Sequence, residues 1–132
     1  MSDAEDLVRR VVDTHNTDPE ALLDAYDELF APDFEFRPIT VGAERNPYRG
    51  REGFEQYYRD RAEVFGGGAV HIRSVETLGD AVVVHARSTA RGRASGASVE
   101  EPISLVYRVR HGRVVSLDVF RSQEDALEAA RA

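Results

Sequence analysis

The sequence contains no cysteine, no tryptophan and one methionine, and all 17 of its basic residues are arginine. Without cysteine there is no disulfide framework, no thiolate nucleophile and no cysteine-ligated metal. Without lysine there is no Schiff base and no P-loop. No apolar run reaches the roughly 18–20 residues of a membrane span, and the acidic N-terminus lacks the apolar stretch of a signal peptide. We therefore expect a cytoplasmic protein that does not contact a membrane.

Length and charge point to one domain without a nucleic-acid partner. The 132 residues match the usual size of a single domain, which we place at residues 1–132. The net charge is −7, and the acids concentrate in residues 1–35, where 11 acids face two arginines. A nucleic-acid-binding protein usually carries a concentrated basic stripe, which is missing here.

Four segments have the residue spacing of helices. Residues 4–14 place aliphatic side chains on one face, and a second helix is expected from Asp18-Pro19 to Pro32. A third helix is expected over residues 52–65, ended by the glycines at 66–68. A short helix over residues 124–130 closes the chain.

The other segments have the alternation of β-strands. In residues 33–39, Phe34 and Phe36 lie on one side, Glu35 and Arg37 lie on the other as an ion pair, and the proline at 38 marks a strand end or an edge. Residues 40–50 are expected to form a loop. Longer strands are predicted at residues 70–78, 81–91, 99–110 and 114–120.

This order of elements predicts an α+β fold. Three N-terminal helices would pack in a strongly curved antiparallel sheet, because each helix must bury one face and long strands can curl around it. The curvature leaves a cavity between the concave face of the sheet and the third helix. A ligand would bind there.

Several short segments carry a family resemblance through their order and spacing. They are LFAPDFEFRP at 29–38, YRGREGFEQYY at 48–58, GDAVVV at 79–84, SG at 95–96 and HGRVV at 111–115. Together they resemble the NTF2-like superfamily of cone-shaped proteins, in its SnoaL-like and ketosteroid-isomerase-like branch. The resemblance covers nearly the whole chain and implies a homodimer. It does not fix an activity, because this fold hosts isomerases, dehydratases, epoxide hydrolases, polyketide cyclases and binding modules.

The catalytic residues of the known relatives do not carry over. Where ketosteroid isomerases have an aspartate base before the proline of the first strand, this chain has Arg37, which cannot accept a proton at working pH. Limonene-epoxide-hydrolase relatives carry Arg-x-Asp on the second long strand and an acid near the end of the last one. The matching places look like Ala86-Arg87-Ser88 and Val119. Neither known catalytic set therefore transfers intact to this chain, which favours a binding protein over an enzyme, and we expect no cofactor.

The register of the last strand decides the place of Asp118. If Leu117 and Val119 face the cavity, Asp118 points outward and is a surface acid, which is the arrangement we favour. In the opposite register Ser116, Asp118 and Phe120 line the cavity, where a carboxylate would have a raised pKa suited to proton transfer.

The four histidines are scattered. His85 lies within a strand whose other face carries the small residues Ala86 and Ser88, so we expect a structural histidine there rather than a base. Whether His71 shares its face stays open, and His15 and His111 are interpreted as helix-end and turn residues. None has the HxH or HxxxH spacing of a metal site, so no metal is expected.

Three functions remain open. We favour binding of a small apolar or aromatic molecule by residues of the predicted cavity, namely Phe36, Tyr57, Ser88, Tyr107 and Phe120. The second is an isomerase, hydrolase or polyketide-cyclase-like enzyme, with Asp118 or His85 as base and Tyr57 or Tyr107 donating to an oxyanion. The third is a dimerisation or interaction module with a collapsed pocket.

Overall fold

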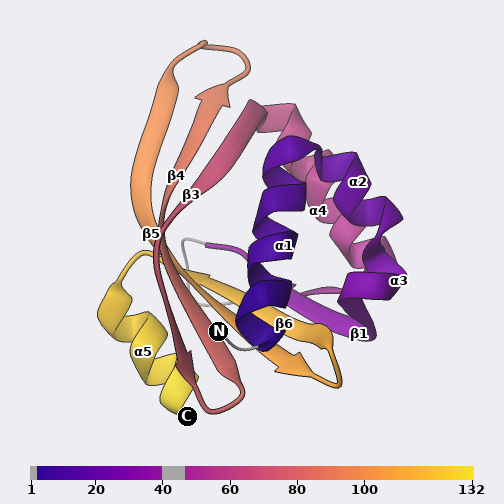
Figure 1. The fold of residues 1–132 in the computed structure, drawn as a ribbon. Helices are drawn as coiled ribbons and strands as arrows, with labels where there is room; N and C mark the ends of the chain where they lie inside the picture. The colour runs from indigo at the N-terminus through magenta and orange to yellow at the C-terminus, as the bar shows by residue number, and fades with distance from the viewer. Residues whose placement is uncertain (1–2, 40–46) are drawn as a thin grey trace.

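The computed structural model describes residues 3–39 and 47–132, with the backbone alone for residues 64–67. The described elements, in chain order, are α1 (Asp3–Thr17), α2 (Pro19–Asp24), α3 (Tyr26–Leu29), β1 (Phe30–Arg37), β2 (Tyr48–Arg49), α4 (Gly50–Val64), β3 (Phe65–Leu78), β4 (Ala81–Gly92), β5 (Ser98–Arg110), β6 (Arg113–Phe120) and α5 (Gln123–Arg131). Helices α1 to α4 lie on one side of a curved sheet, and α5 lies on the other (Figure 1). The predicted α+β class is confirmed. The predicted loop at residues 40–50 falls largely outside the described residues.

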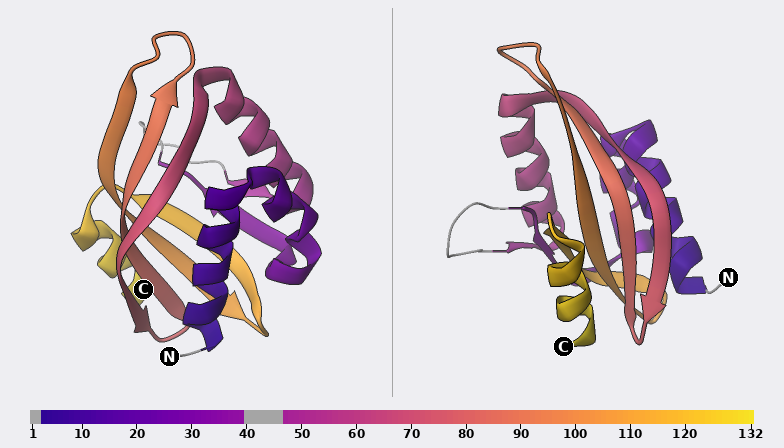
Figure 2. Two further views of the ribbon diagram at one scale, coloured as in Figure 1. Left: turned by 45° about the horizontal axis from the view of Figure 1, so that its top comes forward. Right: turned by 90° about the vertical axis from the view of Figure 1, so that its left-hand side faces the viewer.

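The sheet has the strand order β2-β1-β6-β5-β4-β3. Strands β3 to β6 form the predicted antiparallel meander, and the hairpin joining β4 and β5 extends past the end of α4 (Figure 2). Strand β1 pairs with β6 in parallel, so the sheet is mixed rather than wholly antiparallel. The expectation failed here because turn residues fix the direction of neighbouring strands, whereas nothing local fixes a pairing between segments far apart in sequence.

The second predicted helix is divided and shorter than expected. The chain leaves helical geometry at Ala25, and β1 already begins at Phe30, so Pro32 lies inside a strand instead of closing a helix. A residue that precedes proline avoids the helical region, which favours the extended backbone at Ala31. Pro32 falls where the β1–β6 register shifts, between Phe30 and Glu35, and such an irregular stretch tolerates a residue without an N–H.

Helix α4 ends at Val64, one residue before the predicted end, and β3 starts directly at Phe65 and includes the glycines. Gly68 is needed there for close packing. A Cβ atom at this position would lie 2.6 Å from the carbonyl oxygen of Thr89 on β4 and 2.6 Å from a guanidinium nitrogen of Arg61 on α4. Only glycine lets these two elements approach the strand so closely.

Two apolar clusters fill the two sides of the sheet. The larger lies between the concave face and helices α1 to α4 and includes an aromatic group around Phe54. The smaller lies between the outer face and α5, where Val83 and Val106 meet Ala126 and Ala130. No helix in the described part of the chain is long and apolar enough to cross a membrane.

Candidate ligand-binding cavity

A cavity of about 550 Å³ lies between the concave face of the sheet and helices α1 and α4. Its inner wall consists of nearly fully buried residues: Val11, Val12, Leu22, Phe30, Phe54, Leu105 and Tyr107. More exposed residues form the outer wall, among them Asp60, Val99 and Arg121. The cavity is therefore apolar at its inner end and carries charge towards solvent.

Helix α4 supplies one aromatic wall. The positions i, i+3, i+4 and i+7 of a helix share a face, so Phe54, Tyr57, Tyr58 and Arg61 all point to the cavity side. The ring of Tyr57 meets that of Phe36 on β1 edge to face, with centroids 4.6 Å apart and planes at 81°. This geometry is the favoured one for aromatic pairs, and it forms a wall suited to a flat ring.

A hydrogen-bonded pair, His15 and Tyr58, joins two helices in the cavity wall. The Nδ1 atom of His15 lies 2.7 Å from the hydroxyl oxygen of Tyr58. Burial, reinforced by the charge of Arg61, lowers the pKa of His15 below 6.5, so the ring is neutral at physiological pH. Next to it, Asn16 exchanges two 2.8 Å hydrogen bonds with the backbone of Val70 and so fixes the end of α1 against β3.

Sequence reasoning missed His15, which it placed at a helix end. A signal was available: His15 lies seven residues after Val8 and three or four after the other buried valines of α1, so it shares their face. The sequence did not reveal that α4 would place Tyr58 opposite that face.

Tyr107 reaches the cavity from the middle of β5. Its side chain is 3% exposed, and burial raises the pKa of its hydroxyl well above 10, so the group stays protonated. No described residue forms a hydrogen bond with this hydroxyl, and it is not among the fully enclosed polar atoms that lack a partner. Its oxygen therefore opens into the cavity.

The charged residues around the cavity are engaged with one another or with tyrosines. Asp60 accepts a 2.9 Å hydrogen bond from the Tyr48 hydroxyl, and Arg61 hydrogen-bonds to Tyr57. Arg121 contacts Glu101 at 3.4 Å across β6 and β5. These contacts engage the charged groups of the cavity wall with neighbouring side chains.

Four of the five predicted ligand-binding residues line the cavity, namely Phe36, Tyr57, Ser88 and Tyr107. Their role in binding stays a prediction. The fifth assignment, Phe120, is wrong: this ring packs on the opposite side of the sheet, with the cluster under α5. Leu117 and Val119 line the cavity, and alternation along β6 then sends Phe120 outward.

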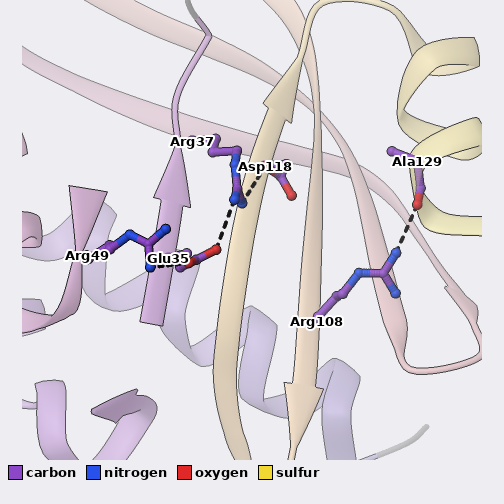
Figure 3. Close-up of polar contacts among 6 residues, drawn as sticks. All are labelled: Glu35, Arg37, Arg49, Arg108, Asp118 and Ala129. Carbon is purple, nitrogen blue, oxygen red and sulfur yellow. Dashed lines mark hydrogen bonds and ion pairs between the residues drawn. The ribbon is translucent and has the colours of Figure 1, made fainter. Parts of the chain in front are cut away.

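Asp118 also lies on the outer face, as favoured from the sequence. It takes part in a chain of charges in which Glu35 contacts Arg37 at 2.9 Å and Arg49 at 3.0 Å, while Arg37 contacts Asp118 at 3.5 Å (Figure 3). The predicted Glu35–Arg37 ion pair is thus present. Asp118 is corrected as a base for a cavity-bound molecule, because it faces away from the cavity.

His85 is a structural histidine of the outer face, as expected. Its Nδ1 atom lies 2.8 Å from the Ser104 hydroxyl, and its Nε2 atom lies 2.8 Å from a carboxylate oxygen of Glu76. His71 pairs with Arg87, two residues beyond His85 on β4, so both histidines share this face. His85 is therefore also corrected as a cavity base.

The family follows from a match to the model of the SnoaL-like domain, which covers residues 8–117. The chain belongs to the SnoaL-like domain family. A search of curated protein sequences finds no significant match.

Solved structures share the cone-shaped NTF2-like fold. An NTF2-like protein of unknown function from Burkholderia pseudomallei has a TM-score of 0.77 at 18% identity, with 100% of both chains covered. A protein assigned as a SnoaL-like polyketide cyclase from a Jannaschia species has a TM-score of 0.77 at 22% identity, covering 98% of this chain and 92% of that one. TerC, co-crystallised with polyporic acid, has a TM-score of 0.76 at 17% identity, covering 99% and 100%. At these identities the similarity establishes the fold of this SnoaL-like chain.

Proposed function

We propose that this SnoaL-like protein binds a small, mostly apolar molecule with an aromatic ring in the cone cavity. The observation that carries the proposal is the cavity itself: about 550 Å³ of space walled by Phe36, Tyr48, Tyr57 and aliphatic side chains. Ligand pockets typically span roughly 300–1,000 Å³ and are mainly apolar with a few placed polar groups. A fully packed cone, as in the third function considered above, would not contain such a space.

The distribution of charge favours a neutral molecule. The inner wall carries no charged side chain among the described lining residues, and its titratable groups, His15, Tyr58 and Tyr107, are all uncharged near pH 7. Arg61 is a cation beside these groups, but its side chain already hydrogen-bonds to Tyr57, so an anion there would lose its hydration for a cation that is already engaged. The co-crystallisation of TerC with polyporic acid supports binding of a small organic molecule by a protein of this fold and does not bear on the charge of the ligand.

Calorimetric titration with diphenylmethane, a hydrocarbon with two rings, tests the proposal. The wild-type chain should bind it, and Ala90→Trp should abolish binding because the indole fills part of the cavity. Thr89→Trp is the matched control, because the neighbouring side chain lies on the other face of β4 and outside the cavity lining. Absence of binding to the wild-type chain, or equal loss in both variants, would overturn the proposal.

Proton transfer is a second candidate function, favoured by one observation. His15 contributes a neutral imidazole to the cavity wall, whereas Asp118 and His85 are not among the lining residues. A neutral histidine is a competent general base near pH 7. NMR of 1-tetralone in D₂O would then show faster exchange of the protons next to the carbonyl with the wild-type chain than with His15→Gln. Equal exchange rates would rule this function out.

We also propose that the chain forms a homodimer through the outer face of its sheet. Helix α5 covers one part of this outer face. The neighbouring part carries the polar side chains of His85 and Arg87 and is where the second chain would pack. Light scattering coupled to gel filtration should give twice the 14.7 kDa mass of the chain. A mass of one chain at micromolar concentration would refute the dimer.

A further inference from the structure

The two edges of the sheet differ in length. Strand β2 forms one edge with only two residues, whereas β3 forms the other with 14. The backbone N–H and C=O groups on the outer side of an edge strand have no neighbouring strand to bond, so they can pair with a strand of another molecule. Short edge strands present few such groups. The long edge of β3 is therefore the place where this chain needs protection against pairing.

The side chain of Asn16 covers part of the β3 edge. Its amide nitrogen donates to the carbonyl oxygen of Val70 at 2.8 Å, and its amide oxygen accepts from the N–H of the same residue at 2.8 Å. A neighbouring antiparallel strand would exchange the same two hydrogen bonds with Val70. The carboxamide thus occupies the place of a strand residue. Among the described residues, no other side chain bonds the backbone of residues 70–78.

A second contact between α1 and β3 keeps Asn16 in this place. The hydroxyl of Thr77 donates a 2.9 Å hydrogen bond to the carboxylate of Glu5. Glu5 and Asn16 are about three helical turns apart, so they lie on the same face of α1. The helix is attached to β3 near both of its ends, and the Thr77 contact uses a side chain and leaves the backbone of the strand uncovered.

The position of Asn16 along the edge is also the most effective one for blocking. Strand β3 pairs with β4 in two regular stretches, residues 68–72 and 74–78, and the register shifts between Ile72 and Ser74. Such a bulge bends an edge and interrupts pairing with a straight partner. Val70 is the central residue of the first regular stretch. A side chain bonded there prevents a partner strand from pairing along this stretch.

The charges of β3 favour a second copy of the chain as the partner. The exposed side chains of His71 and Arg73 lie before Ser74, and the exposed side chain of Glu76 lies after it. Two antiparallel copies related by a two-fold axis place the first half of one strand against the second half of the other. The basic half of each copy then lies against the acidic half of its partner, and cross-strand pairs of opposite charge stabilise a sheet.

We propose that the edge of β3 is a self-association site that Asn16 keeps closed. Without the carboxamide, the N–H and C=O groups of Val70 become available, and two copies pair through β3 in antiparallel orientation. The inference concerns an edge of the sheet. It is therefore independent of ligand binding in the cavity and of the dimer proposed for the outer face.

The test compares the molecular mass of the wild-type chain and Asn16→Ala by light scattering coupled to gel filtration. The variant should have at least twice the wild-type mass at the same concentration, because each open edge binds a second copy. If the wild-type chain is the outer-face dimer, the variant should form chains of dimers, since each dimer has two open edges. Amide hydrogen exchange in residues 70–78 should be slower in the assembled variant than in the wild-type chain.

Asn16→Asp is the matched variant, because it keeps the size of the side chain and the acceptor for the Val70 N–H. It cannot donate to the Val70 carbonyl group, and its charge at the edge disfavours strand pairing. It should therefore loosen α1 as Asn16→Ala does but keep the wild-type mass. Thr17→Ala, which removes a hydroxyl bonded to Asp13 within α1, should also keep the wild-type mass.

Three results would overturn the inference. The first is a wild-type mass for Asn16→Ala, which would mean that the open edge does not pair. The second is equal assembly of Asn16→Ala and Asn16→Asp, because association would then follow from the loosening of α1. The third is assembly of Asn16→Ala without slower exchange in residues 70–78, which would place the contact elsewhere on the molecule.

Discussion

The two faces of the central strands carry equally distinctive polar residues, but these are used differently. On the outer face, His85 is bonded on both ring nitrogens, and Asp118 is paired with Arg37. On the concave face, Tyr107 has no partner within the described residues. The polar groups of the outer face are thus satisfied within the chain, whereas a hydroxyl on the concave face is left open to the cavity.

This difference shows why chemical character alone is a poor guide to a candidate base. Histidine and aspartate draw attention in a strand because they can transfer protons. Their contacts show that both are part of the internal bonding of the outer face. The less reactive tyrosines and His15 occupy the wall where a molecule has room.

The largest expected effect comes from breaking the aromatic support of the concave side. Phe54 is 3% exposed, and its ring lies 5.2 Å from that of Phe30 and 5.4 Å from that of Phe34. Phe54→Ala should lower the free energy of unfolding by about 3–5 kcal/mol, because it leaves an additional void beside the cavity. Phe54→Leu should cost about 1 kcal/mol. Urea denaturation measures both, and equal costs would mean that the ring packing contributes nothing specific.

The next largest effect concerns the outer face. Ser104 is 1% exposed, and it bonds Nδ1 of the buried His85 ring. Ser104→Ala leaves that nitrogen without a partner and should cost about 1–3 kcal/mol of unfolding free energy. Ser116→Ala, on a half-buried serine of the same face, is the control and should change stability by less than about 0.5 kcal/mol. A negligible effect of Ser104→Ala would contradict the internal bonding of this face.

The pH dependence of stability should contain a contribution from His15. Its folded-state pKa lies below the unfolded value of 6.5, so the unfolded chain binds this proton more readily. Its contribution to stability is fully present above pH 6.5 and decreases as the pH falls towards the folded pKa. Arg61 and Tyr58 on α4 face the ring, and protonation would place two cations together.

His15→Gln should therefore reduce the fall in melting temperature between pH 7 and pH 5. Thermal unfolding followed by circular dichroism at several pH values measures it. His111→Gln, in the exposed turn between β5 and β6, should leave the fall unchanged. An unchanged slope in His15→Gln would mean that the imidazole is hydrated in the folded chain.

The local features of the fold were accessible from the sequence. The Gly79-Asp80 and His111-Gly112 turns place both glycines at positive φ, and these turns fix the directions of the meander strands. Alternation along β4 correctly separated Ser88 from His85. The parallel pairing of β1 with β6 was not accessible, since it depends on how the whole chain closes.

The candidate site could be predicted from the sequence only in part, because alternation along a strand is local whereas the packing of separate elements is not. Side chains alternate between the two faces of a strand, so the sequence shows which residues share a face. Once one residue is placed on the cavity side, the faces of all the others in that strand follow. Phe120 was assigned to the cavity although the favoured outward place of Asp118 already put it outside, because both lie on one face of β6. His15 and Tyr58 come from separate helices 43 residues apart, and only packing brings them together.

The smallest expected effect is also the sharpest comparison, because it uses the same substitution on two sides of the core. Tyr26→Phe leaves the carbonyl oxygen of Ala31 without its donor and should cost about 1 kcal/mol of unfolding free energy. Tyr107→Phe removes a hydroxyl without a described partner, so the ligand-free chain should be unchanged or slightly more stable. Chemical denaturation of both variants measures the contrast. If Tyr107→Phe cost as much as Tyr26→Phe, its hydroxyl would be satisfied in the free protein, and the concave face would be bonded as completely as the outer one.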